Sequence, residues 1–396
     1  MADRYVVWFG SVVKGYSAVL NKLDRSTGQI TTLTLDPKNG AHPVGALLDL
    51  GNGQALGLME RAAPDARSAD KDYLKGTGGY AGGAGSDGSR RGHYFVDLKT
   101  RQVLRTVSQF NSITAYSLER VRLDDGTVWD ASLTDNGFRQ FNKLDLSSGK
   151  MLESKAFKYE FSNFAQPPFV LSGRGSAALY LPFWKSDADF VKGYTDTTVS
   201  CMRPDTPAVV HHSDPIGPAQ AGFGNAHRIV YGATYSAANK AMYLATAKVG
   251  DADQGTLFEV DKGVADADLC KAKPTVSVLV SGLSDVPSTR ILALKNGALV
   301  YGTANGKVMS VDVAARKVTL VADLRTGTAA SSRVQGYLAE SGDNAVAVIV
   351  YDRDAAGLNT ARRLVTVNLG TGSQASRDVT RLIAENEPYP GVMRLN

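Results

Sequence analysis

The sequence predicts an all-β protein built from a repeated hairpin, and three observations support this prediction. The segment FNKLDLSSGK at 141–150 joins two apolar-alternating strands through an Asp and a Ser-Ser-Gly turn. Variants of this hairpin recur along the whole chain of 396 residues. Forty glycines accompany a hydrophobic content of 43%, a balance that suits a turn-rich protein with a large core.

The repeat is clearest in the residue that opens the hairpin turn. An Asp or Asn there accepts hydrogen bonds from nearby backbone N–H groups, and a following Gly tolerates positive φ. The third gap between copies is about twice the others, and its midpoint holds TVSCMRPDTPAVVHH, a degenerate copy with Arg203 at the Asp position. The chain therefore contains seven units. The six regular turn-opening residues are Asp24, Asp97, Asp145, Asp261, Asp312 and Asn368.

A second hairpin precedes most of these turns, through Asn-Gly, Asp-Gly or related turns such as the one in VRLDDGTVWDASL. Each unit thus supplies four antiparallel strands, here named A to D in chain order. Seven such sheets predict a seven-bladed β-propeller of four-stranded antiparallel blades, in one domain spanning 1–396. Blades 1 to 7 are predicted at 4–36 with 390–396, 42–110, 116–158, 166–213, 226–281, 288–324 and 332–382.

The first unit has no strand A of its own, and a strand-like tail, YPGVMRL at 389–395, follows the last complete unit. We expect this C-terminal strand to pair beside the segment after Arg4 and so complete blade 1. Such pairing would close the ring and cover both terminal sheet edges.

The hairpin repeats give the whole chain a resemblance to the seven-bladed β-propeller superfamily, particularly to quinoprotein-like and YVTN-type bacterial propellers. The chain lacks a run of WD dipeptides, the Trp-docking repeats of quinoprotein dehydrogenases and the YVTN string itself. The resemblance therefore implies the fold and no specific activity.

The strand order assigns every connection to one end of the propeller. The A–B and C–D turns lie at the lower end and are nearly all tight, whereas the B–C and D–A connections lie at the upper end. Several upper connections are long, and long loops on a rigid scaffold usually carry function. We therefore expect the functional site at the upper end. The long connections are 63–92, 185–196, 213–225 and 352–361.

The glycine-rich stretch KGTGGYAGGAGSDGSRRGHYF lies within the first of these connections. It lacks the Lys-Ser/Thr ending of a phosphate-binding loop and does not open a helix, so we expect a lid or an irregular insert. Arg90, Arg91 and His93 follow the glycines at the upper rim. They are either ligand-binding cations or simply solvated.

Strand A of blades 5, 6 and 7 opens with NAHRIV, PSTRIL and SSRVQG. Because strand A lines the central channel, these segments predict Arg228, Arg290 and Arg333 at one height around the upper mouth. Several guanidiniums around one funnel attract and grip carboxylates or sulfates. The alternative is that these arginines bridge blades by pairing with Asp285 or Glu119.

All five histidines are predicted on or beside the upper end, including the adjacent His211 and His212. A set of Tyr, His and Arg is what a polysaccharide lyase needs, since a cation neutralises the uronate carboxylate and a base removes the α-proton. In that interpretation His227 or His42 is the base, and Tyr116 assists or stacks on the ligand. No spacing predicts a metal site, although the Asp-Ala-Asp segments leave calcium open, and no cofactor is expected.

The net charge of +5 comes from scattered residues and favours anionic ligands without implying nucleic acid. No apolar run is long enough to span a membrane, and MADRYVVWFG does not read as a signal peptide. Cys201 and Cys270 fall in adjacent blades, where they form either a disulfide or two buried thiols. A disulfide would favour the periplasm or the cell exterior for what we expect to be a recognition protein for an acidic polysaccharide or a protein partner. The alternatives are a lyase or other carbohydrate-active enzyme, and a structural subunit of a larger assembly.

Overall fold

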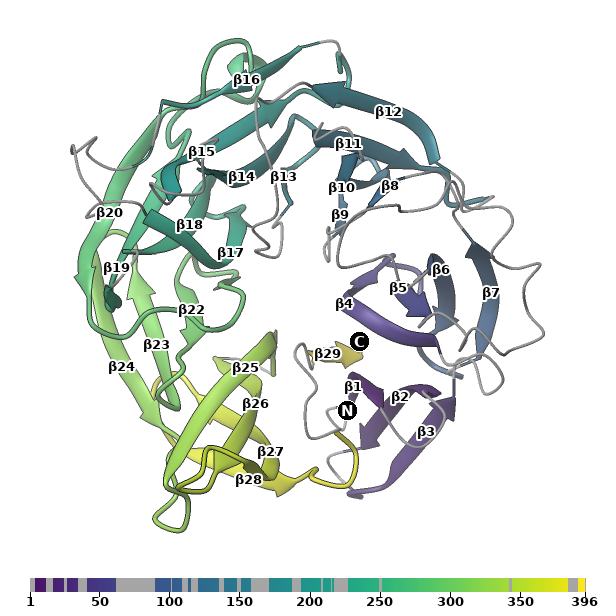
Figure 1. Cartoon of the computed structure of the whole chain (residues 1–396), viewed down its shortest axis with the longest axis vertical. Helices are drawn as coiled ribbons and strands as arrows, with labels where there is room; N and C mark the ends of the chain where they lie inside the picture. Colours follow the sequence, from purple (N-terminus) through teal and green to yellow (C-terminus); the bar gives the residue numbers. More distant parts are fainter. Residues whose placement is uncertain are drawn as a thin grey trace.

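Four-stranded antiparallel sheets are arranged around a central axis, so that the chain is an all-β propeller (Figure 1). The computed structural model describes residues 4–11, 17–24, 27–34, 41–61, 90–100, 102–108, 113–114, 120–134, 139–147, 151–157, 171–186, 194–207, 209–214, 216, 227–248, 251–341, 344–383 and 391–395. At some of these positions it describes the backbone alone. Within these ranges the helical element is one short 3₁₀ turn, η1 (Asp266–Asp268).

Five sheets correspond to the predicted blades 2 to 6. Blade 2 contains β4 (Ala41–Asp49), β5 (Gln54–Arg61), β6 (Arg90–Asp97) and β7 (Val103–Ser108), and blade 3 contains β8 (Ile113–Thr114), β9 (Arg120–Arg122), β10 (Val128–Thr134), β11 (Arg139–Leu144) and β12 (Met151–Phe157). Blade 4 contains β13 (Ser172–Arg174), β14 (Ala178–Ser186), β15 (Tyr194–Met202) and β16 (Val210–His212), and blade 5 contains β17 (His227–Ser236), β18 (Ala241–Lys248), β19 (Asp251–Val260) and β20 (Val276–Leu283). Blade 6 contains β21 (Leu292–Ala293), β22 (Leu299–Gly302), β23 (Lys307–Asp312) and β24 (Lys317–Asp323).

The sixth sheet has eight strands and combines the predicted blades 7 and 1. Its order is β28-β27-β26-β25-β29-β1-β2-β3. The strands are β25 (Ser331–Glu340), β26 (Ala345–Arg353), β27 (Asn359–Asn368), β28 (Gln374–Asp378), β29 (Gly391–Leu395), β1 (Arg4–Ser11), β2 (Ser17–Asp24) and β3 (Ile30–Thr34). We call β25–β28 the blade 7 strands and β29 with β1–β3 the blade 1 strands.

The described strands therefore form six hydrogen-bonded sheets, and the predicted count of seven separate sheets is wrong. The C-terminal β29 pairs antiparallel with β1, from Arg4 opposite Leu395 to Trp8 opposite Gly391. The same strand also makes a parallel bridge to β25, between Tyr337 and Gly391. This one bridge joins two four-stranded groups, because neighbouring inner strands approach each other closely at the axis.

The predicted turn chemistry is present at five of the six regular copies; at the sixth, Asp261, the side chain accepts from the Thr275 N–H across the enlarged loop. Asp97 accepts hydrogen bonds from the backbone N–H groups of Lys99 (2.9 Å) and Thr100 (2.7 Å), and these bonds hold the pKa of Asp97 below its usual value. The same type of local bond, from a backbone N–H to an Asp or Asn oxygen two or three residues earlier, occurs at Asp24, Asp145, Asp312 and Asn368. These side chains fix where each outer hairpin reverses.

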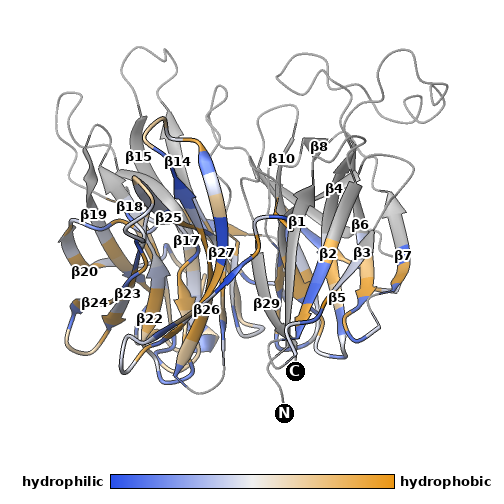
Figure 2. Cartoon of the chain, turned by 90° about the horizontal axis from the view of Figure 1, so that it is seen from below, coloured by the Kyte–Doolittle hydropathy of each residue, from blue (hydrophilic) through white to orange (hydrophobic). Residues whose placement is uncertain are grey.

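The hydrophobic core consists of layers between neighbouring sheets, which is why the middle strands are apolar on both faces. In β26 every residue from Val346 to Asp352 is buried. One side of this strand packs against blade 6 through Val348, and the other packs against blade 1 through Ile349. Burial of both faces favours the near-continuous apolar run AVAVIVY over simple alternation. The side view shows these apolar segments along the strands, with polar residues in many of the described turns (Figure 2).

One described upper connection is shorter than the sequence predicts, and another is a tight turn. In blade 7 the strands continue to Arg353 and resume at Asn359, so the predicted loop 352–361 is a compact turn closed by the Asp354 N–H to Leu358 carbonyl bond of 3.0 Å. In blade 6 the B–C connection is a tight turn in which Gly306 donates to the Thr303 carbonyl. Blade 6 therefore ends at a lower level than its neighbours.

Candidate functional site

The three channel arginines do not lie at one height. Thr289 bridges Gly336 in parallel, and the Arg290 N–H donates to the Gly336 carbonyl at 3.3 Å. Gly336 comes three residues after Arg333 on β25, which places Arg290 roughly 7–10 Å further down the channel at about 3.3 Å per residue. The expectation of a level arginine ring is wrong for Arg290, because blade 6 is short.

The backbone of Arg228 lies nearer to the level of Arg333 than the backbone of Arg290 does. It lies four residues before Gly232 on β17, and a Cβ added at Gly232 would come within 3.1 Å of the Arg290 Cα. Gly232 thus marks the level of Arg290, with Arg228 above it. For Arg228 and the neighbouring His227 the structure describes the backbone alone.

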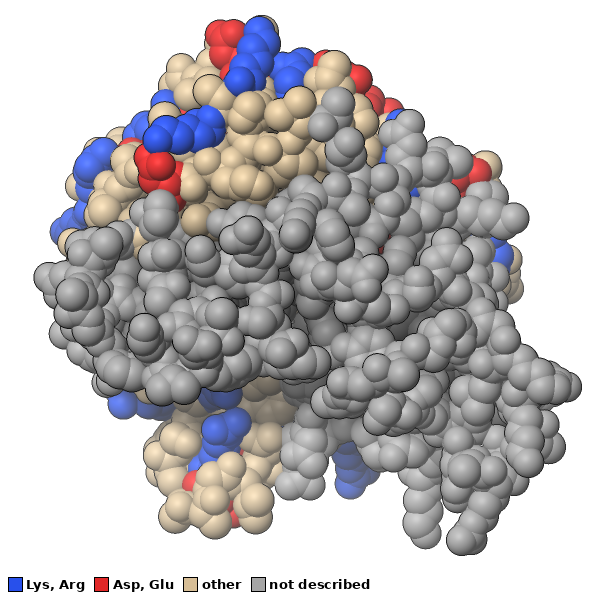
Figure 3. Space-filling model, turned by 45° about the horizontal axis from the view of Figure 1, so that its top comes forward, with Lys and Arg blue, Asp and Glu red and all other residues tan. Residues whose placement is uncertain are grey.

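Two carboxylates near the upper end of blade 6 form ion pairs with nearby basic residues. Asp285, one of the two predicted arginine partners, forms an ion pair with Lys307 at 2.9 Å. Asp323 pairs with Arg325. In the view of Figure 3, basic and acidic side chains lie next to one another on the described surface. The other considered partner, Glu119, lies outside the described residues.

Blade 2 places two predicted site residues in one row across its strands. His42 of β4 is the register partner of Glu60 on β5, and Glu60 is the partner of Arg91 on β6. Arg90 and His93 occupy the same strand as Arg91. A histidine, a carboxylate and an arginine thus share one level of the blade 2 backbone, near the upper end. Tyr116, the predicted stacking residue, lies outside the described residues.

His211 and His212 lie near the lower end, so their predicted upper position is wrong. They end β16, in which His211 pairs with Cys201 and His212 pairs with Ser200. Both partners are close to Met202, the last residue of β15 at its lower end. The physical reason is that β16 has only three residues and begins directly after the lower turn.

Ser200 and His212 form a hydrogen-bonded pair that has no access for a substrate. The Ser200 Oγ lies 2.9 Å from the His212 Nδ1, but Ser200 is 0% exposed. Burial, followed by the charge of His211, lowers the pKa of His212. This serine and histidine therefore join two strands and do not form a nucleophile with its base.

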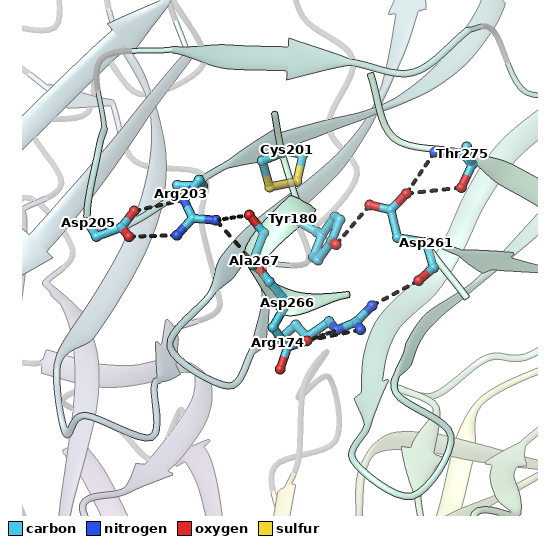
Figure 4. The surroundings of a disulfide bond; sticks show 10 residues. Arg174, Tyr180, Cys201, Arg203, Asp205, Asp261, Asp266, Ala267 and Thr275 are labelled. Atoms are coloured by element: carbon cyan, nitrogen blue, oxygen red, sulfur yellow. Dashed lines mark hydrogen bonds and ion pairs between the residues drawn. A yellow bond between two sulfur atoms is a disulfide. The ribbon is translucent and has the colours of Figure 1, made fainter. Parts of the chain in front are cut away.

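A disulfide joins Cys201 of β15 to Cys270 in the enlarged lower loop of blade 5, with their Cα atoms 5.3 Å apart (Figure 4). The same loop is held by Arg174 of β13, which is 2% exposed. The Arg174 guanidinium donates to the carbonyls of Asp261 (2.8 Å) and Val264 (2.6 Å) and pairs with the Asp266 carboxylate at 3.0 Å. Blades 4 and 5 are thus joined covalently and by a buried cation.

Tyr180 adds a further bond within this layer. Its hydroxyl donates to the Asp261 carboxylate at 2.9 Å, and the other Asp261 oxygen accepts from the Thr275 N–H at 2.8 Å (Figure 4). Burial and the neighbouring Asp261 charge raise the pKa of Tyr180, so the hydroxyl keeps its proton. The loop is therefore a structural element held by several bonds to blade 4.

A cavity of about 440 Å³ opens between blades 2 and 3 at the lower end. Leu50, Phe95, Arg105, Arg122 and Leu146 contribute to its lining. The Arg105 guanidinium lies 4.0 Å from the centre of the Phe95 ring and donates to the Leu146 carbonyl. Its cation is thus used to hold the two blades together.

Within the described ranges, no group of three or more His, Cys, Asp or Glu side chains is arranged to hold a metal ion. The Asp-Ala-Asp segment at 266–268 forms η1, where Asp266 pairs with Arg174 and Asp268 pairs with Lys271. Among the residues that the structure describes, no helix is long and apolar enough to cross a membrane.

Three buried arginines among the described residues, Arg120, Arg174 and Arg362, were not predicted from the sequence. Arg362 of β27 is 6% exposed and lies in the same cross-strand row as Arg333, with Tyr351 between them. The only sequence signal for Arg362 is an arginine at a core position of a predicted strand, and that signal requires the strand register.

Known proteins resemble this chain in fold alone. The sequence matches no protein-family model, and no curated protein matches it with significance. Among solved structures, a hypothetical selenium-binding protein from Sulfolobus tokodaii is 12% identical, with a TM-score of 0.59 over 99% of this chain and 93% of that chain. The periplasmic gluconolactonase of Pseudomonas aeruginosa is 13% identical, with a TM-score of 0.55 over 99% of each chain. The polysaccharide lyase Uly1 is 11% identical, with a TM-score of 0.51 over 92% of this chain and 88% of that chain. These names differ in function, so the similarity supports the propeller fold and no single activity.

Proposed function

We propose that this chain is an extracytoplasmic recognition protein that binds an anionic ligand, an acidic polysaccharide or a protein partner, at its upper end and channel mouth. The observation that carries the proposal is Arg333 on the inner strand β25, whose buried Nε has no hydrogen-bond partner among the described residues. Arg228 on the inner strand β17 and Arg290, two residues before β21, are further positive charges of the two preceding blades. Guanidiniums are well suited to carboxylates and sulfates because their N–H groups match two oxygens at once.

We also propose that the eight-stranded sheet comprises two blades, so that the six sheets make seven blades, and that β29 closes the ring. The order of the eight-stranded sheet supports this, since β29 stands between β25 and β1. In this arrangement every first strand lines one channel, and the upper connections surround one mouth. The extracytoplasmic location is supported by the Cys201–Cys270 disulfide, because disulfides persist in oxidising compartments.

A second candidate function is a polysaccharide lyase at the same end. The row of His42, Glu60 and Arg91 across blade 2 favours this candidate. It would combine a cation for the uronate carboxylate with a base for the α-proton. His227 and Tyr116 remain predicted participants.

Binding to polygalacturonate, alginate and hyaluronate, measured by titration calorimetry at two salt concentrations, tests the recognition function. We expect Arg333→Gln to weaken binding about 10-fold, or roughly 1.4 kcal/mol, and to reduce its salt dependence. The matched control is Lys295→Gln, which removes the same charge from an exposed lower turn. Equal losses in both variants would contradict binding at the channel mouth. Incubation with the same polymers while recording the absorbance of unsaturated uronates tests the lyase, and no rise with any polymer would exclude that candidate.

A further inference from the structure

Two arginines lie on one face of the blade 7 strands near the upper end. Arg333 of β25 pairs in register with Tyr351 of β26, and Tyr351 pairs with Arg362 of β27. Register partners on neighbouring antiparallel strands have side chains on the same face of the sheet. On this face Tyr351 packs with Leu23 of blade 1. Both arginines therefore belong to the face that blade 1 covers.

Arg362 is a buried cation without a partner in the described part of the chain. Arg362 is 6% exposed, and neither its Nε nor its Nη2 has a hydrogen-bond partner. The Nε of Arg333 is buried and unpartnered in the same way. Guanidinium carries only donors and stays charged, so it cannot relieve its burial by losing a proton. A buried charge without a counter-charge is strongly unfavourable.

The adjacent residue shows how this chain satisfies a largely buried arginine. Arg363 lies on the opposite face of β27 and donates to both oxygens of Asp352, at 2.6 and 2.9 Å, and to the Leu324 carbonyl at 2.7 Å. Asp352 also accepts a bond from the Ser332 hydroxyl at 2.6 Å. The Asp352 carboxylate is therefore engaged by these groups on the other face, away from Arg362.

We propose that Arg333 and Arg362 bind an oxyanion, a carboxylate or a sulfate group, on the face of blade 7 that meets blade 1. This inference rests on the proposed function, because it names the ligand group and the residues that hold it. The unpartnered N–H donors of both residues supply the contacts, and partly exposed Arg333 connects the buried Arg362 to the channel side. An external oxyanion supplies the counter-charge that the described protein groups do not.

Thermal unfolding of the full chain in sodium acetate, sodium sulfate and sodium chloride, at equal ionic strength, tests this site. For the wild type we expect acetate or sulfate to raise the Tm above its value in chloride, saturably and by about 2–4 °C. For Arg362→Met we expect this rise to be absent. We also expect its Tm in chloride to be no lower than that of the wild type, because the variant removes a buried unpaired charge.

The matched control is Arg363→Met, one residue further along β27 on the opposite face. This variant leaves Asp352 without its cation, so its Tm should fall in every salt, yet the oxyanion-dependent rise should remain. The control also accounts for the general stabilising effect of sulfate on folded proteins. A rise with acetate alone identifies a carboxylate ligand, and a rise with sulfate alone identifies a sulfate ester.

The inference is overturned if Arg362→Met loses several degrees in every salt and shows the same oxyanion response as the wild type. If Arg362→Met does not fold, Arg333→Met decides, since it must reduce the rise while remaining folded. The two proposals fail separately. Polysaccharide binding that is equally tight in wild type and Arg362→Met contradicts the oxyanion site only, whereas an oxyanion response without any polymer or protein ligand contradicts the recognition function only.

Discussion

At the residue scale, arginines provide many of the polar connections between distant parts of this chain. Arg174 joins blade 4 to the blade 5 loop. Arg363 of blade 7 donates to the carbonyl of Leu324, which lies in the connection between β24 of blade 6 and β25 of blade 7. A planar guanidinium can serve several acceptors at once without deprotonation. Arg174 and Arg363, each with several acceptors in the protein, are thus structural, and Arg362 differs from them.

Replacement of Arg174 tests the strength of these connections. Arg174→Met should lower the free energy of unfolding by about 2–4 kcal/mol, because it leaves the buried carbonyls of Asp261 and Val264 without their donor. Denaturant titration measures this loss. Arg203→Met is the control, since the more exposed Arg203 also contacts this loop and pairs with Asp205, and should cost about 1 kcal/mol or less. Similar losses in the two variants would contradict a special role for the buried cation.

His212 should make the stability of the folded chain depend on pH. Burial lowers the pKa of His212 in the folded state, so the unfolded chain takes up its proton first as the pH falls. The free energy of unfolding contributed by His212 is therefore present above about pH 6.5, the ordinary pKa of His, and is lost as the pH falls through the lower folded-state value. Thermal unfolding between pH 7.5 and 5.5 should show a smaller decrease for His212→Asn than for the wild type.

The neighbouring histidine supplies the control for this pH experiment. His211→Asn removes only the smaller cause of the shift and leaves the burial of His212 in place. It should therefore retain most of the wild-type decrease. A His212→Asn decrease equal to that of the wild type would show that His212 does not set this pH dependence.

The contrast between turn residues and buried arginines shows what sequence could predict at this scale. The Asp97 turn bonds groups two and three residues away, so its chemistry is contained in a short segment. Arg174 bonds groups about 90 residues away, as its Val264 contact shows. Such a contact depends on which strands face each other, and that information is absent from local sequence.

At the element scale, the enlarged lower loop of blade 5 is held to blade 4 by the disulfide. Replacement of both Cys201 and Cys270 by Ala should lower the free energy of unfolding by about 2–4 kcal/mol, because the bond spans a sequence separation of 69 residues. Denaturant titration with and without dithiothreitol measures the effect. The wild type should move toward the double variant under reducing conditions, whereas the double variant should not respond. A wild type unaffected by replacement or reduction would contradict a stabilising disulfide.

The lengths of individual strands explain why two predicted site residues lie at other heights than the sequence predicts. The position of Arg290 followed from equal blade heights, but the tight turn at Thr303–Gly306 makes blade 6 short. The predicted upper position of His212 assumed a full-length outer strand, but β16 is only three residues long. Alternating apolar patterns reveal that strands exist, whereas their ends depend on neighbouring strands and on loops that a local pattern does not contain.

At the scale of the whole molecule, the repeat predicted the architecture because each blade must bury both faces against its neighbours. The layer between blades 6 and 7, for example, brings together Val300, Val334 and Val365 from three strands. The sheet count could not be predicted in the same way. It depends on one parallel bridge, between Tyr337 and Gly391, that has no sequence signature.

The C-terminal strand should be required for a stable propeller. β29 pairs along β1 from Trp8 to Arg4, so truncation after Pro390 would leave β1 with an uncovered inner edge. We expect this truncation to lower the Tm by at least about 5 °C and to promote aggregation, because it removes a paired strand and exposes backbone hydrogen-bonding groups. The control is truncation after Leu395, which keeps all of β29 and should unfold like the wild type. A peptide of sequence PGVMRLN added to the shorter chain should restore part of the lost Tm by adding the strand from outside. An unchanged Tm after removal of β29 would mean that β1 does not need this strand, and the proposal of a ring closed at this point would then fail.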